Sequence, residues 1–269
     1  MTSIYVVGHK PFALPEGADS SYRPMMVGPS KPWGRENGYA VDDDGLNISD
    51  KNSTFCELTA YYWAWKNPSD DDLLGFCHYR RYFMENDAPL NTSTIERIFS
   101  DPTVVMIVPE KTTWRMDKVT DAYIRGAGYQ QDLIHTENVI REKWPEYLDA
   151  FHEVLDSNSA YYRNMLIARR DIFEAYCSWL FSILFEVEKR VDLSSYNATE
   201  RRVFGFLSEI LLNVYIVAKK LKVVEVPTSS FDVESKGTKT KQTVMRFGKS
   251  MIKRIVWFPT GINPKKRSS

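Results

Sequence analysis

Residues 73–83, LLGFCHYRRYF, bring side chains that suit an anion to one point of the chain. The apolar run predicts a buried strand, and His78, Arg80 and Arg81 stand at its end. Arginine carries forked donors that match phosphate oxygens. Adjacent arginines point apart on a strand, so one ligand that met both would lie across the strand end, as a diphosphate can. The alternative is a pair of surface arginines in ion pairs with the acidic run at 70–72.

Apolar strands and periodic helices alternate along the chain, which predicts an α/β fold with a mainly parallel sheet flanked by helices. Ligands of such sheets bind at the carboxyl ends of strands. His9 and Lys10 follow the first strand, and Arg169 and Arg170 follow another, so we expect an anionic substrate such as a nucleotide diphosphate. Neither G-x-G-x-x-G nor G-x-x-x-x-G-K-[ST] occurs, which argues against dehydrogenases and P-loop enzymes. The expected strands are 4–7, 73–79, 104–108, 164–168 and 223–226, and the expected helices are 54–67, 136–155, 171–190 and 200–220. A loop-rich region is expected between the first strand and about residue 52, and Thr54 and Glu57 have the spacing of a capping box, which predicts the start of the first helix.

The composition is that of a folded domain, since 43% of the 269 residues are hydrophobic and 13% are aromatic. Its three cysteines are far apart and lie in apolar sequence, so we expect buried thiols and a reducing compartment. No secretory signal and no membrane-spanning window is visible, which predicts a cytoplasmic location.

Charge is distributed unevenly between a body and a tail. Residues 236–269 contain ten Lys or Arg and no acid, which leaves 25 bases against 35 acids in residues 1–235, a net charge of −10. Apolar residues recur every three or four positions in 243–258, a pattern typical of a basic amphipathic helix on an anionic membrane. The alternative is a last helix packed on the domain. The acidic body disfavours nucleic acid as a partner.

Five segments resemble a bacterial capsular and exopolysaccharide glycosyltransferase family that was first catalogued as a domain of unknown function. They are IYVVGHKPFALP at 4–15, NISDKNSTFCELTAYYWAWKN at 47–67, and residues 73–83, 161–192 and 201–216. The similarity covers about residues 3–232. It implies a GT-A-like nucleotide-sugar-binding fold and transfer from a donor such as UDP-galactofuranose or another UDP-hexose to a lipid-linked oligosaccharide at the inner face of the membrane. A noncatalytic nucleotide-sugar or polysaccharide-binding regulator on the same fold is the competing class.

The resemblance also suggests how the donor is held. Where a GT-A enzyme commonly places Asp-x-Asp, this chain has His78-Tyr79-Arg80-Arg81, so we expect arginines to neutralise the leaving diphosphate and a divalent metal, Mg²⁺ or Mn²⁺, not to be essential. No prosthetic group is expected. The acidic runs at 42–44 and 70–72 are rival metal sites, but solvated turns explain both better. The other predicted donor-binding residues are His9, Lys10, Asp50, Lys51, Asn52 and Asn164.

Inverting transfer needs a carboxylate that takes the proton of the acceptor hydroxyl. Glu209 lies in an apolar helix, where desolvation would raise its pKa as a base requires, so it is the first candidate. A structural ion pair with Arg202 is the alternative. Asp132 is a second candidate base, although the neighbouring 124–131 stretch lacks the histidines of the family and acceptor recognition should differ accordingly.

Overall fold

The structure, a computed structural model, describes residues 1–126, 128–231 and 255–256. Its central sheet has the strand order β13-β11-β7-β10-β4-β1-β2-β3. Outside this order, β5 pairs with β4, and β6 and β12 pair with β5. The strands of this order are β13 (Ile255–Val256), β11 (Val223–Val226), β7 (Met106–Pro109), β10 (Leu166–Arg169), β4 (Leu73–His78), β1 (Thr2–Gly8), β2 (Tyr22–Met26) and β3 (Ala40–Val41), and those attached to it are β5 (Arg81–Glu85), β6 (Ala88–Pro89) and β12 (Thr228–Ser230).

Strands β11, β7, β4, β1, β2 and β3 run in one direction, and β10 runs in the opposite direction between β7 and β4. The expected α/β fold with a mainly parallel sheet is confirmed. A separate ladder pairs β8 (Thr112–Thr113) with β9 (Ser159–Ala160). The reversal of β10 matters for the site, because the start of β10 lies at the edge where β4 ends.

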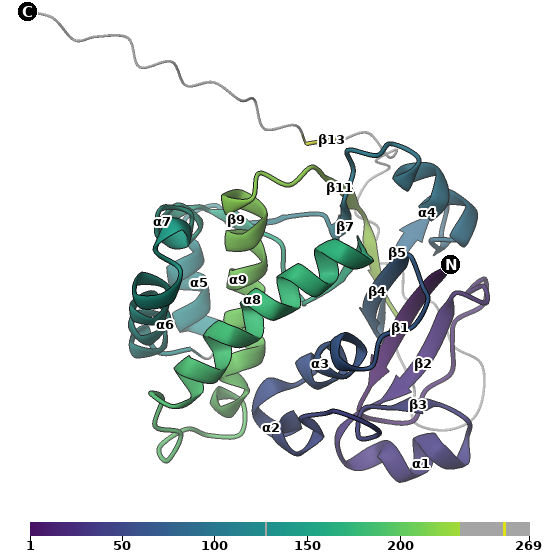
Figure 1. Cartoon of the computed structure of the whole chain (residues 1–269), viewed down its shortest axis with the longest axis horizontal. Helices are drawn as coiled ribbons and strands as arrows, with labels where there is room; N and C mark the ends of the chain where they lie inside the picture. Colours follow the sequence, from purple (N-terminus) through teal and green to yellow (C-terminus); the bar gives the residue numbers. More distant parts are fainter. Residues whose placement is uncertain (127, 232–254, 257–269) are drawn as a thin grey trace, which may run out of the picture.

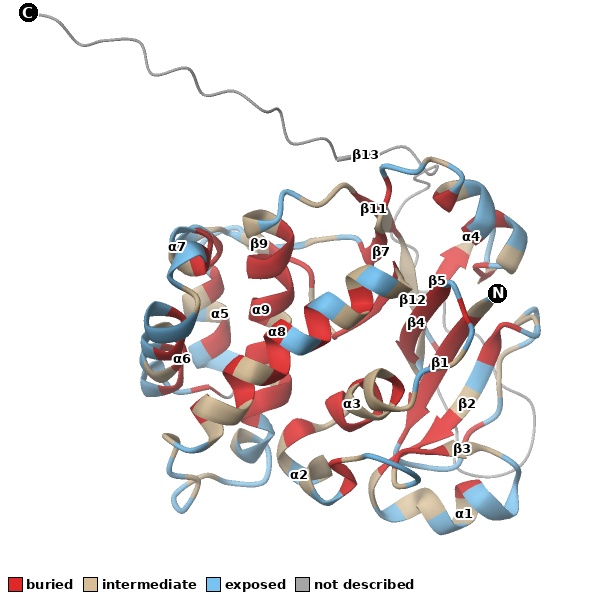
Figure 2. Cartoon of the chain, in the orientation of Figure 1, coloured by how far each residue is buried: buried red, intermediate tan, exposed pale blue. Residues whose placement is uncertain are grey.

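Alternation along the strands explains the layers. Tyr5 and Val7 of β1 enter one apolar cluster, while Ile4 and Val6 enter the other, so both faces of the sheet are buried. Helices α3, α8 and α9 cover the first face, with α5, α6 and α7 beside them, and α1 and α4 contribute to the second (Figure 1). Figure 2 shows buried stripes on α8 and α9, whereas α6 and α7 expose much of their surface. The helices are α1 (Lys31–Glu36), α2 (Asn52–Phe55), α3 (Leu58–Lys66), α4 (Thr92–Phe99), α5 (Val119–Gly126), α6 (Gln130–Lys143), α7 (Leu148–Asp156), α8 (Arg170–Glu188) and α9 (Val203–Ala218).

Two expected helices are interrupted in the structure. The segment 54–67 is split between α2 and α3 at Cys56, whose φ of 52° lies in the left-handed region and cannot continue a helix. The capping box expected from Thr54 and Glu57 is absent there, because the Thr54 hydroxyl donates to the carbonyl of Lys51. The segment 136–155 is broken after Trp144 by Pro145. The region 8–52, expected to be loop-rich, also contains β2, α1 and β3.

The basic tail lies mostly outside the described residues, as does the expected boundary at 235. Within the expected helix at 243–258, Ile255 and Val256 pair antiparallel with Val224 and Val223 of β11, so these two residues are in a strand and the prediction of a helix is wrong there. Among the described residues, no helix combines the length and the apolar character needed to cross a bilayer.

Candidate functional site

The carboxyl ends of β1, β2 and β4 meet at one edge of the sheet. The register pairs Val7 with His78, and Gly8 with Met26, so the segments after these strands start side by side. The hydroxyl of Ser30 donates to the carbonyl of His9 over 2.8 Å and ties the loop after β2 to the loop after β1. We call this the ligand edge, since open α/β sheets bind ligands at such positions.

The turn at Arg163 and Asn164 reaches the ligand edge because β10 is antiparallel to β4. The backbone N–H of Arg163 donates to Oε1 of Glu209 over 2.9 Å. Its carbonyl accepts from Nε2 of His78 over 2.5 Å, and because a carbonyl can only accept, Nε2 carries the hydrogen. The Arg163 side chain donates to the hydroxyl of Thr228 over 2.8 Å. One residue therefore joins β4, α9 and β12.

Asn164 connects the same turn to the start of α3. Its side-chain amide donates to Oε1 of Glu57 over 2.7 Å and to the carbonyl of Gly205 over 2.9 Å. Its Oδ1 accepts from the hydroxyl of Ser208 over 2.9 Å, and its own carbonyl accepts from the hydroxyl of Tyr61 over 2.7 Å. Both amide hydrogens are used within the protein, so the geometry gives Asn164 a positioning role, and direct binding of a sugar stays a prediction.

Backbone strain gathers at this edge. Outside glycine, positive φ angles occur in the described chain at six residues, and three of them are Cys56 (52°), Arg163 (81°) and Asn164 (45°). Each such residue costs on the order of 1–3 kcal/mol and persists only where its surroundings enforce it. Cys56 precedes Glu57, and the Arg163–Asn164 turn holds both Glu57 and Glu209. The strained positions thus present two carboxylates at one place, which is an arrangement typical of functional sites.

Glu209 has the electrostatics predicted for a base. Burial, and then the charge of Glu57, raise the pKa of Glu209 to about 8, while the hydrogen bond from Arg163 and the charges of Arg202 and Arg163 act in the opposite direction. A carboxylate with a pKa this close to neutral pH can hold and release a proton under physiological conditions.

Arg80 and Arg81 supply positive charge without a carboxylate partner. No ion pair joins either guanidinium to a carboxylate in the described residues, although Arg80 lies 5.2 Å from the ring centre of Tyr79. Burial, and then the charges of Arg163 and Arg80, lower the pKa of Arg81. The alternative interpretation, in which these arginines form ion pairs with the acidic run at 70–72, therefore does not hold, and their charges remain available to an anionic ligand.

His9 and His78 lie within reach of the same charges. Burial lowers the pKa of His9 first, followed by the charges of Lys10 and Arg80. Burial also lowers the pKa of His78, against the opposing charge of Glu57. The His9 ring meets Tyr79 edge-to-face, with centres 5.4 Å apart. Both shifts favour the neutral form of the imidazole.

The alternative for Glu209, a structural ion pair with Arg202, is not formed among the described residues. Nε of Arg202 donates to Sγ of Cys56 over 3.2 Å, and its guanidinium lies 5.1 Å from the ring centre of Phe206. Arg202 still lowers the pKa of Glu209 through its charge. Its side chain therefore stands near both carboxylates and adds a further cation to the ligand edge.

The predicted Asp50-Lys51-Asn52 segment has mixed roles. Asp50 is exposed, whereas Nζ of Lys51 makes an ion pair of 2.6 Å with Glu188 at the end of α8. Asn52 donates to the carbonyl of Cys56 over 2.9 Å. Gly28 lies against it with φ +65°, and a Cβ on Gly28 would come within 2.5 Å of Asn52 Oδ1. This close approach brings Asn52 against the loop that follows β2, and a contact with the donor stays a prediction.

Asp132 lies in a structural cluster between α5 and α6. It is fully buried, and its carboxylate accepts from the hydroxyl groups of Tyr123 and Tyr196 and from the backbone N–H of Tyr129. Both oxygens are occupied by donors within the protein. This environment holds the ends of two helices together.

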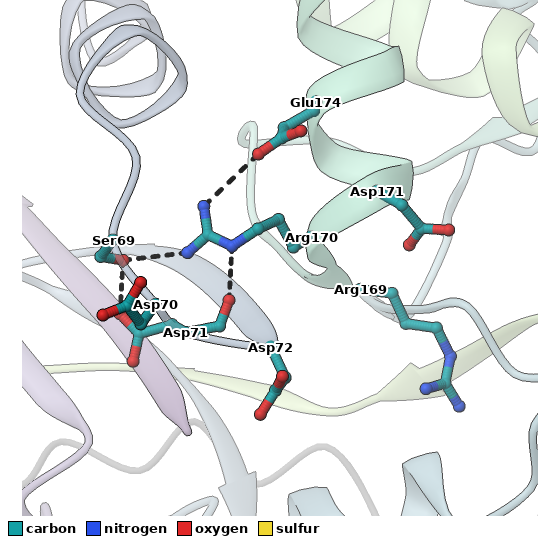
Figure 3. A pocket seen from close by; sticks show the side chains of 8 residues that line it. All are labelled: Ser69, Asp70, Asp71, Asp72, Arg169, Arg170, Asp171 and Glu174. Atoms are coloured by element: carbon teal, nitrogen blue, oxygen red, sulfur yellow. Dashed lines mark hydrogen bonds and ion pairs between the residues drawn. The ribbon is translucent and has the colours of Figure 1, made fainter.

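Arg169 and Arg170 are at the opposite edge of the sheet, so the prediction that they share the ligand edge is wrong. The reason is the direction of β10, which pairs Arg169 with Leu73 at the start of β4. Figure 3 shows Arg170 in an open pocket, where its guanidinium contacts Ser69, the carbonyl of Asp71 and Glu174. These contacts fasten the start of α8 to the loop before β4.

No group of three His, Cys, Asp or Glu that could hold a metal occurs in the described part of the chain. The expected metal independence stays a prediction. The interpretation of both acidic runs as solvated turns is wrong for Asp42 and Asp71, which are buried. Asp42 accepts from Ser49, and burial raises its pKa. The three cysteines are free thiols, two of them buried.

The comparisons with known proteins place this chain in a family. A family described as a domain of unknown function, DUF4422, matches residues 3–220. This chain belongs to it. One solved chain, titled WbbM bifunctional glycosyltransferase in its apo structure, is similar to the DUF4422 chain with a TM-score of 0.71 and 32% identity. The match covers 85% of this chain and 45% of that one, so this chain spans less than half of the neighbour's length. No curated protein matches.

The candidate site of this chain contains two residues that the sequence analysis does not place there. Glu57 is predicted only as part of a helix cap, and Arg163 has no predicted role. Glu57 lies in a segment that carries the family resemblance, and this position is the one sequence feature that points to a functional role. Nothing in the sequence predicts the break in the helix at Cys56. Arg163 holds His78 and Glu209 through its backbone, and backbone contacts do not depend on the type of side chain.

Proposed function

We propose that this protein is a glycosyltransferase. It moves a hexose, such as the galactofuranose of UDP-galactofuranose, from a nucleotide-diphosphate donor to a lipid-linked oligosaccharide in capsule, exopolysaccharide or O-antigen synthesis. The observation that carries the proposal is the placement of Glu209, with its pKa raised to about 8, at the same edge as the guanidinium groups of Arg80 and Arg81. The similarity to part of a bifunctional glycosyltransferase supports the reaction class.

The reaction assigned to this edge is an inverting displacement. The acceptor hydroxyl oxygen attacks the anomeric carbon while Glu209 takes the hydroxyl proton. The bond from that carbon to the diphosphate breaks with its electron pair, and the diphosphate leaves on the opposite face. Arg80 and Arg81 stabilise the charge that develops on the leaving oxygen. His9, Lys10 and the segment 50–52 bind the nucleotide side of the donor.

The uneven charge of the chain, with an acidic body and a basic tail, supports a location at a membrane surface. The basic tail would hold the acidic body at the inner face of the cell membrane, next to lipid-linked acceptors. The enzyme is then cytoplasmic and peripheral, and neither a prosthetic group nor nucleic acid takes part.

A panel of nucleotide sugars tests the proposal. The wild-type protein and Glu209→Gln are mixed with each donor and a lipid-linked acceptor, and released nucleotide diphosphate is measured. Release by the wild type alone supports a transferase. Binding of a donor by both proteins, with no release under any condition, would instead identify a noncatalytic regulator that binds nucleotide sugars.

A further inference from the structure

Two carboxylates are held at the ligand edge by neighbouring residues of a single turn. Arg163 donates its backbone N–H to Glu209, and Asn164 donates its side-chain amide to Glu57. The two acids are 152 positions apart in the chain, as their numbers show, and come from different elements. Nothing in local sequence would bring them together, so the turn sets their relative placement.

The turn is itself rigidly supported. Ser208, which precedes Glu209 on α9, donates to Oδ1 of Asn164, and the carbonyl of Gly205 accepts from the Asn164 amide. The amide orientation is therefore determined on both sides, and Oε1 of Glu57 is held in one direction. These hydrogen bonds help to hold the strained backbone of the turn in place.

We propose that Glu57, held by the side-chain amide of Asn164, is a positioning residue for the proposed base Glu209, which the backbone of Arg163 holds at the same turn. The inference rests on the proposed function for the identity of the base. Like charges in a partly buried site repel each other, so negative charge at Glu57 disfavours a second negative charge at Glu209.

Other charged and titratable groups also surround Glu209. Some of them act on its pKa in the direction opposite to that of Glu57. The cations lower the Glu209 pKa, whereas burial and Glu57 raise it. Glu209 in turn affects the pKa values of neighbours on β5, on the segment before β10 and in the break before α3. Among the described residues, the groups that interact electrostatically with Glu209 include Glu57, Arg81, Arg163, Arg202, Tyr162 and Cys56.

The test is to titrate Glu209 directly in the full-length protein. Carbon-13 NMR of glutamate side-chain carboxyls follows each acid, and Glu209→Gln assigns its signal. In Glu57→Gln, which removes the charge and keeps an oxygen for Asn164, the Glu209 midpoint should fall by about one pH unit or more. Glu57→Asp keeps the charge at a greater distance and should give an intermediate midpoint. Glu85→Gln, a half-buried acid bonded to Thr94, is the matched control and should leave the midpoint unchanged.

The pH profile of kcat/KM should move with the NMR midpoint, toward lower pH in Glu57→Gln. A purely structural role of Glu57 would lower stability and activity at every pH without moving either midpoint, and that result would overturn the inference. If Glu57→Gln does not fold, Glu57→Asp provides the test, and an unchanged Glu209 midpoint in that variant would also overturn the inference. The NMR titration needs no substrate, so a protein that transfers no sugar but shows the shift contradicts the proposed function alone.

Discussion

The backbone N–H of Arg163 donates to Oε1 of Glu209 over 2.9 Å, from a residue whose φ of 81° lies in the left-handed region. A strained residue other than glycine is retained here because its N–H, its carbonyl and its side chain all make hydrogen bonds. The contact orients the Glu209 carboxylate at the edge where β4 and β1 end.

Arg80→Ala and Arg81→Ala should each lower kcat by roughly 100- to 1000-fold, because the leaving diphosphate loses a positioned donor. Steady-state release of nucleotide diphosphate measures the effect, and Lys at either position should restore only part of the rate. Arg141→Ala, on the outer helix α6, is the control and should retain normal turnover. Wild-type rates in both variants at the ligand edge would exclude these arginines from the reaction.

Glu209→Gln should bind donor normally and lose transfer, because an amide of nearly the same shape cannot accept the proton. The loss should fall on kcat, as single-turnover and donor-titration experiments would show. In the wild type, kcat/KM should rise with pH toward about 8, where the carboxylate becomes ionised.

Asp132→Asn is the comparison for Glu209, since Asp132 is the other candidate base. The described contacts predict a lower melting temperature and a nearly normal kcat for the folded fraction, because two tyrosine hydroxyls and a helix cap lose their acceptor. If Asp132→Asn abolished transfer while Glu209→Gln did not, the base would be Asp132.

Glu209→Gln should also stabilise the protein at alkaline pH. The pKa of Glu209 is raised from 4.5 to about 8, so the native state keeps a proton that the unfolded chain releases over this range. The wild type therefore loses stability as pH rises between these values, and Gln, which does not ionise, avoids this loss. Urea denaturation should show the variant gaining about 1–3 kcal/mol over the wild type between about pH 5 and pH 9. A constant difference across this range would show that Glu209 has an ordinary pKa.

Activity should survive EDTA, with added Mg²⁺ or Mn²⁺ giving at most a modest increase, because arginines take the place of Asp-x-Asp. Rates of nucleotide diphosphate release before and after chelation measure this. Complete loss with EDTA and recovery with Mn²⁺ would assign a metal role to acids of the 42–44 or 70–72 runs, or to His78.

Truncation after Asp232 should abolish binding to anionic vesicles and transfer to lipid-linked acceptors, while donor binding is largely kept. Each Lys or Arg near an anionic surface contributes on the order of 1 kcal/mol. Flotation with and without high salt measures attachment, and salt should weaken it without full release if apolar residues also insert. The truncation removes β13 as well, so circular dichroism must show a folded body. Unfolding, or full-length protein that ignores anionic vesicles, would favour a structural role for the tail.

Local patterns in the sequence determined much of this fold. Period-two alternation and apolar runs located β1, β4 and β11, and periodic apolar faces located α8 and α9, because burial on a sheet or a helix face depends on spacing along the chain. The arginines after β4 were recognisable in the same way, since a strand end is a local feature.

The tertiary structure alone decided which strand ends share an edge and which acids meet. The direction of β10 took Arg169 and Arg170 away from the site and brought Arg163 and Asn164 into it, and direction depends on pairing with distant strands. The break at Cys56 turned Glu57 from an expected cap into a neighbour of Glu209. Such a break is enforced by contacts from α9, where Gly205 lies against Cys56, and no short-range pattern encodes those contacts.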